Sequence, residues 1–309
     1  MKRFIPLFIV LIFLGAGAYF ILNTPSSSLQ TSQSLFRLDE FDKQKSCARL
    51  PLFLYKNGIN APIIDLSQKH YKGIAFYFGP KYSRVLHKKS WERFDALGTY
   101  TIDNKGDIYL TPNPFISIKP TTFNLQKAIY KLDGKSAELS RWMVIEEVAP
   151  NPTNPYGLIS IVYDCDSGYL IASSIDKSSY RGVGGRIYLI DRDKKEILQR
   201  VEGFDALTLN ILKSRDKKYL IAGSARDGGV YLFRFKEDGK LDKNKIKLFE
   251  LPTPELKVRK IKVIDKNTLK LEAIKFNYSL VAQSAKKHRE EFIAKYDPKT
   301  GRWEVKRVE

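Results

Sequence analysis

The sequence predicts an all-β protein built as a β-propeller of five to six four-stranded blades, preceded by one N-terminal transmembrane helix. Two observations predict the propeller: short β-rich runs pair across tight turns, and two kinds of hairpin alternate along the chain from about residue 50. An uncharged apolar stretch near the N-terminus predicts the helix. A β-sandwich is the alternative architecture, but it does not require this regular alternation of hairpins.

The apolar stretch covers residues 4–22 and contains no charged side chain. About 20 such residues span a bilayer as a helix. Lys2 and Arg3 precede the stretch and a neutral segment follows it, so the positive-inside rule keeps the N-terminus in the cytoplasm and exports the body. The expected location is therefore the inner (cytoplasmic) membrane, single-pass, with the body on the extracytoplasmic (periplasmic) side. A signal peptide cleaved near Ala16-Gly-Ala18 is the alternative, although the apolar run continues past that site.

Three parts of the chain follow from this pattern. Residues 1–22 form the anchor, or an uncleaved signal, residues 23–46 a flexible tether rich at its start in Ser, Thr and Gln, and residues 47–309 the propeller domain. Cys47 and Cys165 are too far apart for a CxxC metal or redox motif. Outside the cytoplasm the two can pair, which stabilises the fold by roughly 4–5 kcal/mol in the chain-entropy model, and two unpaired cysteines are the alternative.

The charge balance is strongly basic, with 53 Lys and Arg against 34 Asp and Glu, for a net charge of +19. Such a balance suits a nucleic acid or an anionic membrane. Here the cations occur singly or in pairs beside acids, as in Asp191-Arg-Asp-Lys-Lys-Glu196, and the sequence contains no dense basic patch or nucleic-acid motif. A solvated, Lys-rich surface is favoured, and a nucleic-acid partner is not expected.

The first kind of hairpin is expected to be innermost in each blade and has Asp, Asn or Gly at its turn. Four copies lie at residues 98–111, 158–173, 207–223 and 260–273. The second kind pairs an aromatic-rich strand with a more polar one and lies at residues 128–139, 186–198, 230–241 and 292–303. One hairpin of each kind makes one four-stranded blade.

These pairs predict full blades at residues 96–142, 157–201, 206–250 and 258–308. Residues 51–89 supply a first, irregular blade, and a sixth blade would need strands with no readable register. Long connections within blades are expected at residues 112–125 and 275–290.

The tetrapeptide Phe-Asp-Ala-Leu occurs twice, at residues 94–97 and 204–207, each time just before an innermost strand. Because innermost strands line the channel of a propeller, Asp95 and Asp205 are expected at equivalent places on one rim. Carboxylate and amide oxygens bind hard divalent cations such as Ca²⁺. The structural alternative is that each Asp accepts backbone N–H groups and fixes the start of its strand.

Three segments, at residues 99–110, 154–173 and 185–198, share this repeat pattern. The pattern resembles the SMP-30/gluconolactonase-like and NHL-like six-bladed propellers over roughly residues 70–305. In the lactonase-like branch, carboxylates and amides from different blades hold a divalent metal in the channel. The resemblance implies one divalent cation (Ca²⁺, Zn²⁺ or Mn²⁺) held by Asp95, Asn154 and Asp205. The family's first-blade glutamate has no match in this chain.

Four residues near the same rim are candidates for ligand contacts: Tyr156, Arg181, Arg226 and Asp227. Tyr156 and Arg181 would give an anionic ligand aromatic and cationic contacts. The predicted function is a membrane-anchored extracytoplasmic propeller that binds a small molecule, a glycan or a protein on its central rim. The alternative is a metal-dependent lactone or ester hydrolase of SMP-30/gluconolactonase type. The sequence alone leaves open whether the protein is an enzyme.

Overall fold

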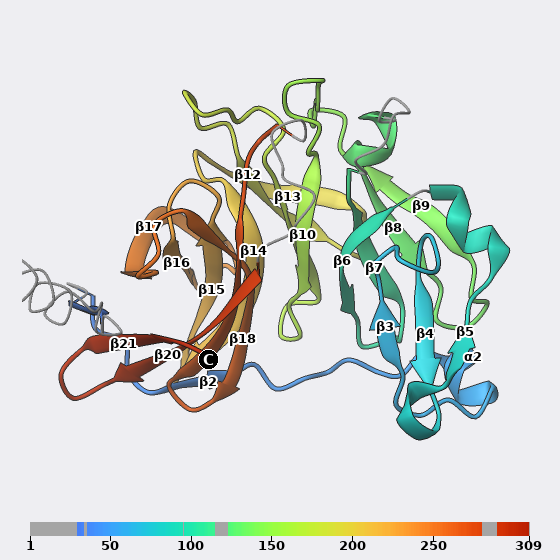
Figure 1. Ribbon diagram of the computed structural model, residues 1–309, viewed down its shortest axis with the longest axis horizontal. Helices are drawn as coiled ribbons and strands as arrows, with labels where there is room; N and C mark the ends of the chain where they lie inside the picture. Colours follow the sequence, from blue (N-terminus) through green and yellow to red (C-terminus); the bar gives the residue numbers. More distant parts are fainter. Residues whose placement is uncertain (1–29, 34–35, 95, 115–122, 280–288, 309) are drawn as a thin grey trace, which may run out of the picture.

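Five antiparallel sheets stand around a central axis in the computed structural model, which describes residues 30–33, 36–94, 96–114, 123–279 and 289–308 (Figure 1). The innermost strands of consecutive sheets face one another, β6 against β10, β10 against β14 and β14 against β18. The predicted all-β propeller is confirmed, and the described part of the chain forms five blades.

The blades follow one another in chain order and are called blades I to V. Blade I has three strands, β3 (Ile63–Asp65), β4 (Ala75–Phe78) and β5 (Arg84–Leu86). Blade II has β6 (Leu97–Ile102), β7 (Ile108–Pro112), β8 (Ala128–Leu132) and β9 (Leu139–Val144). Blade III has β10 (Leu158–Tyr163), β11 (Tyr169–Ser174), β12 (Arg186–Asp191) and β13 (Glu196–Glu202). Blade IV has β14 (Ala206–Ser214), β15 (Lys217–Ser224), β16 (Gly229–Phe235) and β17 (Leu241–Glu250). Blade V has β18 (Leu256–Asp265), β19 (Thr268–Lys275), β20 (Arg289–Asp297) and β21 (Arg302–Arg307).

Turn chemistry explains why the inner hairpins form where the sequence predicts them. The Asp103 carboxylate accepts the backbone N–H groups of Lys105 at 2.8 Å and Asp107 at 2.9 Å, which closes the β6–β7 turn. The second strand of a blade is covered on both faces by neighbouring blades, so β7 is buried along its whole length. The four predicted full blades therefore appear with their predicted hairpins. The first blade is irregular, as expected, with only three described strands.

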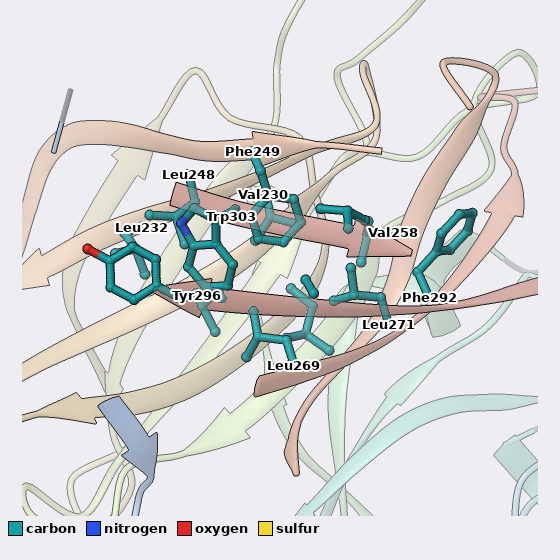
Figure 2. Packing of buried hydrophobic residues seen from close by; sticks show 14 of the residues in the cluster. Val230, Leu232, Leu248, Phe249, Val258, Leu269, Leu271, Phe292, Tyr296 and Trp303 are labelled. Carbon is teal, nitrogen blue, oxygen red and sulfur yellow. The ribbon is translucent and has the colours of Figure 1, made fainter. Parts of the chain in front are cut away.

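Aliphatic and aromatic side chains together fill the core between blades IV and V (Figure 2). Trp303 of β21 is fully buried, and its ring lies 4.7 Å from that of Phe249 and 5.6 Å from that of Phe41, between ring centroids. Because Phe41 lies before the first blade, this packing draws the N-terminal segment into the core.

The segment 36–56, called the strap, crosses the face of the ring that carries the inner hairpin turns, called the turn face. It is the blue segment along the lower edge of Figure 1, from β2 (Phe41–Lys43) to α2 (Leu52–Lys56). Three backbone hydrogen bonds, from Asn267 to Phe41, from Arg49 to Asp103 and from Phe53 to Gly134, hold the strap to blades V and II. The opposite face, which carries the connections between the second and third strands of each blade and between consecutive blades, is called the loop face.

Part of the expected tether, residues 23–46, belongs to the fold instead. β1 (Gln30–Gln33) pairs with the outer strand β21 of blade V, and β2 pairs with β14 of blade IV. Both are short strands that cover an otherwise open sheet edge. Blades IV and V therefore have five strands rather than the four that the sequence predicts.

Cys47 of the strap and Cys165 in the β10–β11 turn form a disulfide, with their Cα atoms 5.7 Å apart. The alternative of two unpaired cysteines is thereby wrong. Beside the disulfide, the Gln44 side chain donates to the Asp164 carboxylate at 2.8 Å. The strap is thus held to blade III by a covalent bond and by a side-chain hydrogen bond.

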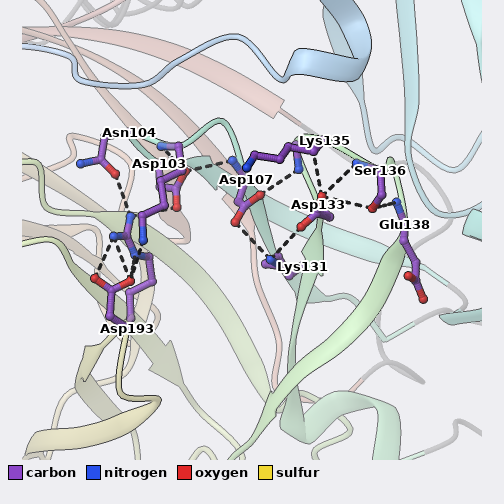
Figure 3. Close-up of polar contacts among 12 residues, drawn as sticks. Asp103, Asn104, Asp107, Lys131, Asp133, Lys135, Ser136, Glu138 and Asp193 are labelled. Atoms are coloured by element: carbon purple, nitrogen blue, oxygen red, sulfur yellow. Dashed lines mark hydrogen bonds and ion pairs between the residues drawn. The ribbon is translucent and has the colours of Figure 1, made fainter.

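Ion pairs on the turn face link residues between blades and within blade II (Figure 3). The buried Arg192 guanidinium donates to the Asp103 carboxylate at 2.9 Å and joins blade III to blade II. Within blade II, Lys131 donates to Asp107 and Asp133, each at 3.1 Å. Hydrogen bonds from the Ser136 backbone and from the Lys131 side chain hold the pKa of Asp133 well below its usual range.

Helical structure is sparse in the described chain. Besides α2, the short 3-10 helices are η1 (Pro80–Tyr82), η2 (Lys89–Phe94) and η3 (Phe123–Lys127). The last of these ends the long connection predicted at residues 112–125. In the portion that the structure describes, no helix has the length and apolar character needed to cross a membrane. The predicted anchor, residues 4–22, lies outside the described residues, and its helix stays a prediction.

Candidate functional site

A cavity of about 1200 Å³ lies on the axis of the ring, and residues from all five blades line it. The walls come from the innermost strands β6, β10, β14 and β18 and from connections of the loop face. Within the described ranges, no residue of the strap and no inner hairpin turn contributes to the lining. The cavity therefore belongs to the loop-face half of the ring.

Hydrogen bonds between neighbouring innermost strands hold the walls in place. The Ser160 hydroxyl accepts the backbone N–H of Leu209 at 3.0 Å, which joins blades III and IV. The Asn210 amide donates to the Ile261 carbonyl at 2.8 Å, which joins blades IV and V. Because these bonds satisfy polar groups on the strand edges, the walls are fixed before any ligand enters.

The wall of the cavity is both apolar and charged. Apolar side chains of the innermost strands and the rings of Tyr156 and Phe276, 5.2 Å apart, line one part. Of the described residues that line the cavity, five are cationic and three are acidic. One acid, Glu272, already pairs with Lys260 at 3.0 Å and with Arg289 at 3.4 Å. The lining therefore has an excess of positive charge.

Arg259 of β18 lies between blades IV and V at this wall. One of its guanidinium nitrogens donates to the Leu207 carbonyl at 2.9 Å. Among the described residues, no carboxylate lies within ion-pair distance of it, although Glu272 is near enough to act on its charge. Burial lowers the pKa of Arg259, and the charge of Glu272 opposes that shift. Arginine nevertheless stays protonated in proteins, so this is a poorly solvated cation at the cavity wall.

Asp205 lies just before β14, as predicted, and its side chain is fully buried. One carboxylate oxygen accepts the Ser178 hydroxyl and the Gly185 N–H, the latter at 2.8 Å. The other accepts the Tyr278 hydroxyl at 2.5 Å and the Arg226 guanidinium at 3.2 Å. These four donors come from blades III, IV and V, so Asp205 fastens three blades together on the loop face. A cation at Asp205 would have to displace some of these donors.

Asn154 is also buried, and it lies beside the β11–β12 connection of blade III, which contains Ser178. Its amide NH₂ donates to the Ile175 carbonyl at 2.6 Å and to the Ser178 carbonyl at 2.8 Å, and its oxygen accepts the Tyr156 N–H at 3.2 Å. Asn154 and Asp205 therefore share a contact with Ser178, which brings these two predicted ligands to one place.

Asp95 lies outside the described residues, so the structure does not relate it to the other two predicted ligands. Among the residues that are described, no three or more His, Cys, Asp or Glu side chains gather as a metal site would require. The divalent cation therefore stays a prediction.

The candidate ligand contacts separate into different environments. Tyr156 lines the cavity, whereas Arg226 donates to Asp205 and to the carbonyls of Ser179, Tyr180 and Gly182 at 3.0, 3.1 and 3.0 Å. Burial alone would lower the pKa of Arg226, but hydrogen bonds and charge interactions with Asp205 and Tyr278 together outweigh it and raise the pKa. Arg226 thus acts as a clamp on the β11–β12 connection.

Asp227 and Arg181 lie away from the cavity wall. The Asp227 carboxylate accepts the Tyr231 hydroxyl at 2.7 Å and lies 3.2 Å from the Lys247 ammonium. Burial alone would raise the pKa of Asp227, but these contacts outweigh it and lower the pKa. Arg181 is exposed, and its backbone N–H donates to the Ser179 hydroxyl at 3.2 Å.

Sequence reasoning missed the cavity residues Arg259, Phe276 and Tyr180. A signal for Arg259 was present, because the innermost strand reads Lys257-Val-Arg-Lys-Ile-Lys262, with charges where an apolar strand is expected. Phe276 and Tyr180 lie in connections, where no periodic pattern indicates which way a side chain points.

No protein-family model matches the chain, and no curated protein matches it. Among solved structures, a protein from Lactobacillus plantarum is similar at a TM-score of 0.45 and 11% identity, covering 89% of this chain and 67% of that one. The Bacteroides ovatus xyloglucan PUL GH43B is similar at a TM-score of 0.42 and 12% identity, covering 69% of this chain and 41% of that one. A xylan β-1,4-xylosidase from Bacillus halodurans is similar at a TM-score of 0.41 and 13% identity, covering 68% of this chain and 41% of that one. The chain thus spans less than half the length of the two glycan-named proteins, and likenesses of this size assign no activity to it.

Proposed function

We propose that the protein is a membrane-anchored, extracytoplasmic β-propeller that binds a small molecule or glycan in its central cavity. The observation that carries the proposal is a cavity of about 1200 Å³ lined from all five blades. Small-molecule sites commonly occupy roughly 300–1,000 Å³ and combine apolar walls with a few polar groups. This cavity has room for such a ligand and has both kinds of wall.

The compartment in the proposal has two supports. Disulfides persist mainly in oxidising compartments, and Cys47 pairs with Cys165. The apolar stretch 4–22 follows two cations, as in an exported protein with an uncleaved anchor. Residues 23–29 would then connect the anchor to β1, and seven extended residues reach at most about 25 Å. The propeller would therefore stay close to the membrane surface.

We do not advance the metal-dependent lactone or ester hydrolase. Its best-placed predicted ligand, Asp205, has both oxygens engaged by four protein donors. The arrangement serves to hold connections of three blades in place, which suits a binding protein with a fixed rim.

A fluorescent reporter in the cavity tests the proposal. Tyr100 lines the cavity and is 41% exposed, so Tyr100→Trp places an indole there, and Tyr55→Trp places one on α2 of the turn face as the matched control. The full chain in detergent is titrated with a panel of neutral sugars, sugar acids, aromatic acids, aromatic alcohols and inorganic phosphate. We expect a saturable fluorescence change in Tyr100→Trp with at least one compound and no change in Tyr55→Trp. A panel that leaves both reporters silent, or that moves both equally, would overturn the proposal.

A further inference from the structure

We propose, resting on the function proposed above, that the cavity takes a small carboxylic acid with a ring-shaped body. Its carboxylate would pair with Arg259, and its ring would lie against Tyr156 and Phe276. Sugar acids and aromatic acids share this chemistry, and the experiment below separates them.

The charge of the lining favours an anion. Lysine and arginine outnumber acids among the described lining residues by five to three. Glu272 is shared by Lys260 and Arg289, and Asp65 accepts the N–H and hydroxyl of Ser67 at 2.8 and 3.1 Å. A concave, low-dielectric wall focuses such an excess of positive potential into the cavity.

Arg259 supplies the specific contact. A guanidinium has five N–H donors in a planar fork, and among the described residues Arg259 donates one hydrogen bond, to the Leu207 carbonyl at 2.9 Å. The fork matches a carboxylate through two parallel hydrogen bonds. A partly buried cation without a carboxylate at ion-pair distance is unfavourable, so a bound acid would supply the direct partner that Arg259 lacks among the described residues.

An aromatic wall stands beside this cation. The rings of Tyr156 and Phe276 lie 5.2 Å apart and both line the cavity. The row continues through Tyr278, 5.3 Å from Phe276, to Tyr180, 6.0 Å from Tyr278 and 67% exposed. Aromatic faces bind the apolar faces of other rings, so a ring body is favoured over a compact ion such as phosphate.

Matched pairs of ligands test the assignment by titration calorimetry on the full chain in detergent. The pairs are glucuronate against glucose and benzoate against benzyl alcohol, with inorganic phosphate as a third arm. We expect one acid to bind roughly tenfold or more tightly than its neutral partner, because only the acid can accept a charged hydrogen bond from Arg259 and such a bond is worth about that factor in affinity. Arg259→Gln should remove that difference, whereas Lys262→Gln, which removes another cation of the same lining, should change it less than threefold.

The variants separate this inference from the proposed function. If a neutral compound moves the Tyr100→Trp reporter as well as its acid does, or if Arg259→Gln keeps the preference for the acid, the carboxylate assignment is overturned and cavity binding stands. Binding of phosphate without either acid would overturn the ring-shaped body. Should Arg259→Gln unfold, Arg259→Lys replaces it, because the ammonium keeps the charge and loses the fork. An acid preference equal to that of the unmutated chain would then overturn the paired hydrogen bonds.

Discussion

Asp205→Asn is the substitution that best distinguishes a fastening residue from a metal ligand. Asparagine keeps the shape of the side chain but replaces one acceptor oxygen with an NH₂ group. Two of the four donors that now face the carboxylate, either Ser178 and Gly185 or Arg226 and Tyr278, would then face another donor. The charge that pairs with the Arg226 guanidinium at 3.2 Å would also be lost.

The cost follows from burial. Breaking a buried charge pair by removing one partner costs about 3–5 kcal/mol, and a buried donor left without an acceptor costs about 1–3 kcal/mol. The Arg226 side chain is 30% exposed and keeps its bonds to three carbonyls, which moderates the loss. We therefore expect Asp205→Asn to lower the free energy of unfolding by about 3 kcal/mol. With an unfolding entropy of about 2.1 cal/mol/K per residue, this corresponds for a chain of 309 residues to a fall in Tm of about 5 °C.

Guanidinium denaturation of the full chain in detergent, followed by circular dichroism, measures this cost. Asp227→Asn is the matched control, because that carboxylate also contacts a tyrosine and a cation but is 33% exposed, and about 1 kcal/mol is expected there. An Asp205→Asn cost within 0.5 kcal/mol of the control would refute the fastening argument. So would a difference between unmutated protein and Asp205→Asn that disappears in excess EDTA, because Asp205 would then stabilise the fold through a metal.

Three further substitutions test the frame around the cavity. Replacing Cys47 and Cys165 with serine should lower the free energy of unfolding by about 5 kcal/mol, according to the chain-entropy model for a loop with a sequence separation of 118. Reducing the disulfide of the native protein should lower the free energy of unfolding by the same amount in denaturant melts. No decrease in either experiment would contradict this prediction. Gly185→Ala should cost at least about 2 kcal/mol, since its Cβ would lie 2.4 Å from an Asp205 carboxylate oxygen, and an unchanged Tm would exclude that clash. Asp164→Asn tests pH dependence. Burial raises the pKa of Asp164, but hydrogen bonds from a lysine, a serine and a glutamine outweigh it and lower the pKa. The carboxylate therefore stabilises the fold fully above its unfolded pKa of about 3.9, and this stabilisation is lost as pH falls through the lower folded pKa. In urea melts, the difference in free energy of unfolding between the unmutated protein and Asp164→Asn should be constant from pH 7 to about 5 and smaller at pH 3. A difference that stays constant to pH 3 would contradict this prediction.

Local chemistry made most of the blades predictable. The β10–β11 hairpin was expected at residues 158–173 and lies at Leu158–Tyr163 and Tyr169–Ser174. The turn between them begins at Asp164, whose carboxylate accepts the N–H of Asp166 at 3.3 Å, so the residues that predict the turn are those that close it. The start of an innermost strand at the second Phe-Asp-Ala-Leu was also predictable, because β14 begins at Ala206. The donors that hold Asp205 there come from distant parts of the chain and were not predictable.

Long-range pairing was not predictable, because no local pattern encodes it. β1 reads Gln-Thr-Ser-Gln, has no apolar alternation, and pairs with β21 at the far end of the chain. The residues of the cavity wall were missed for a related reason. A charged residue in an innermost strand, such as Arg259, is indistinguishable in sequence from one on a solvated edge, and only closure of the ring turns it towards an enclosed space.

Asp205 and the cavity are linked through one connection of blade III. Ser178 and Gly185, which donate to Asp205, flank Tyr180, which lines the cavity. The Arg226 clamp holds the Tyr180 carbonyl at 3.1 Å, so the same network that fastens the blades also sets the position of this wall. The turn face is fixed independently by the strap and its disulfide. Loosening the Asp205 network should therefore weaken ligand binding as well as stability, whereas Asp164→Asn on the turn face should lower stability and leave binding in the cavity unchanged.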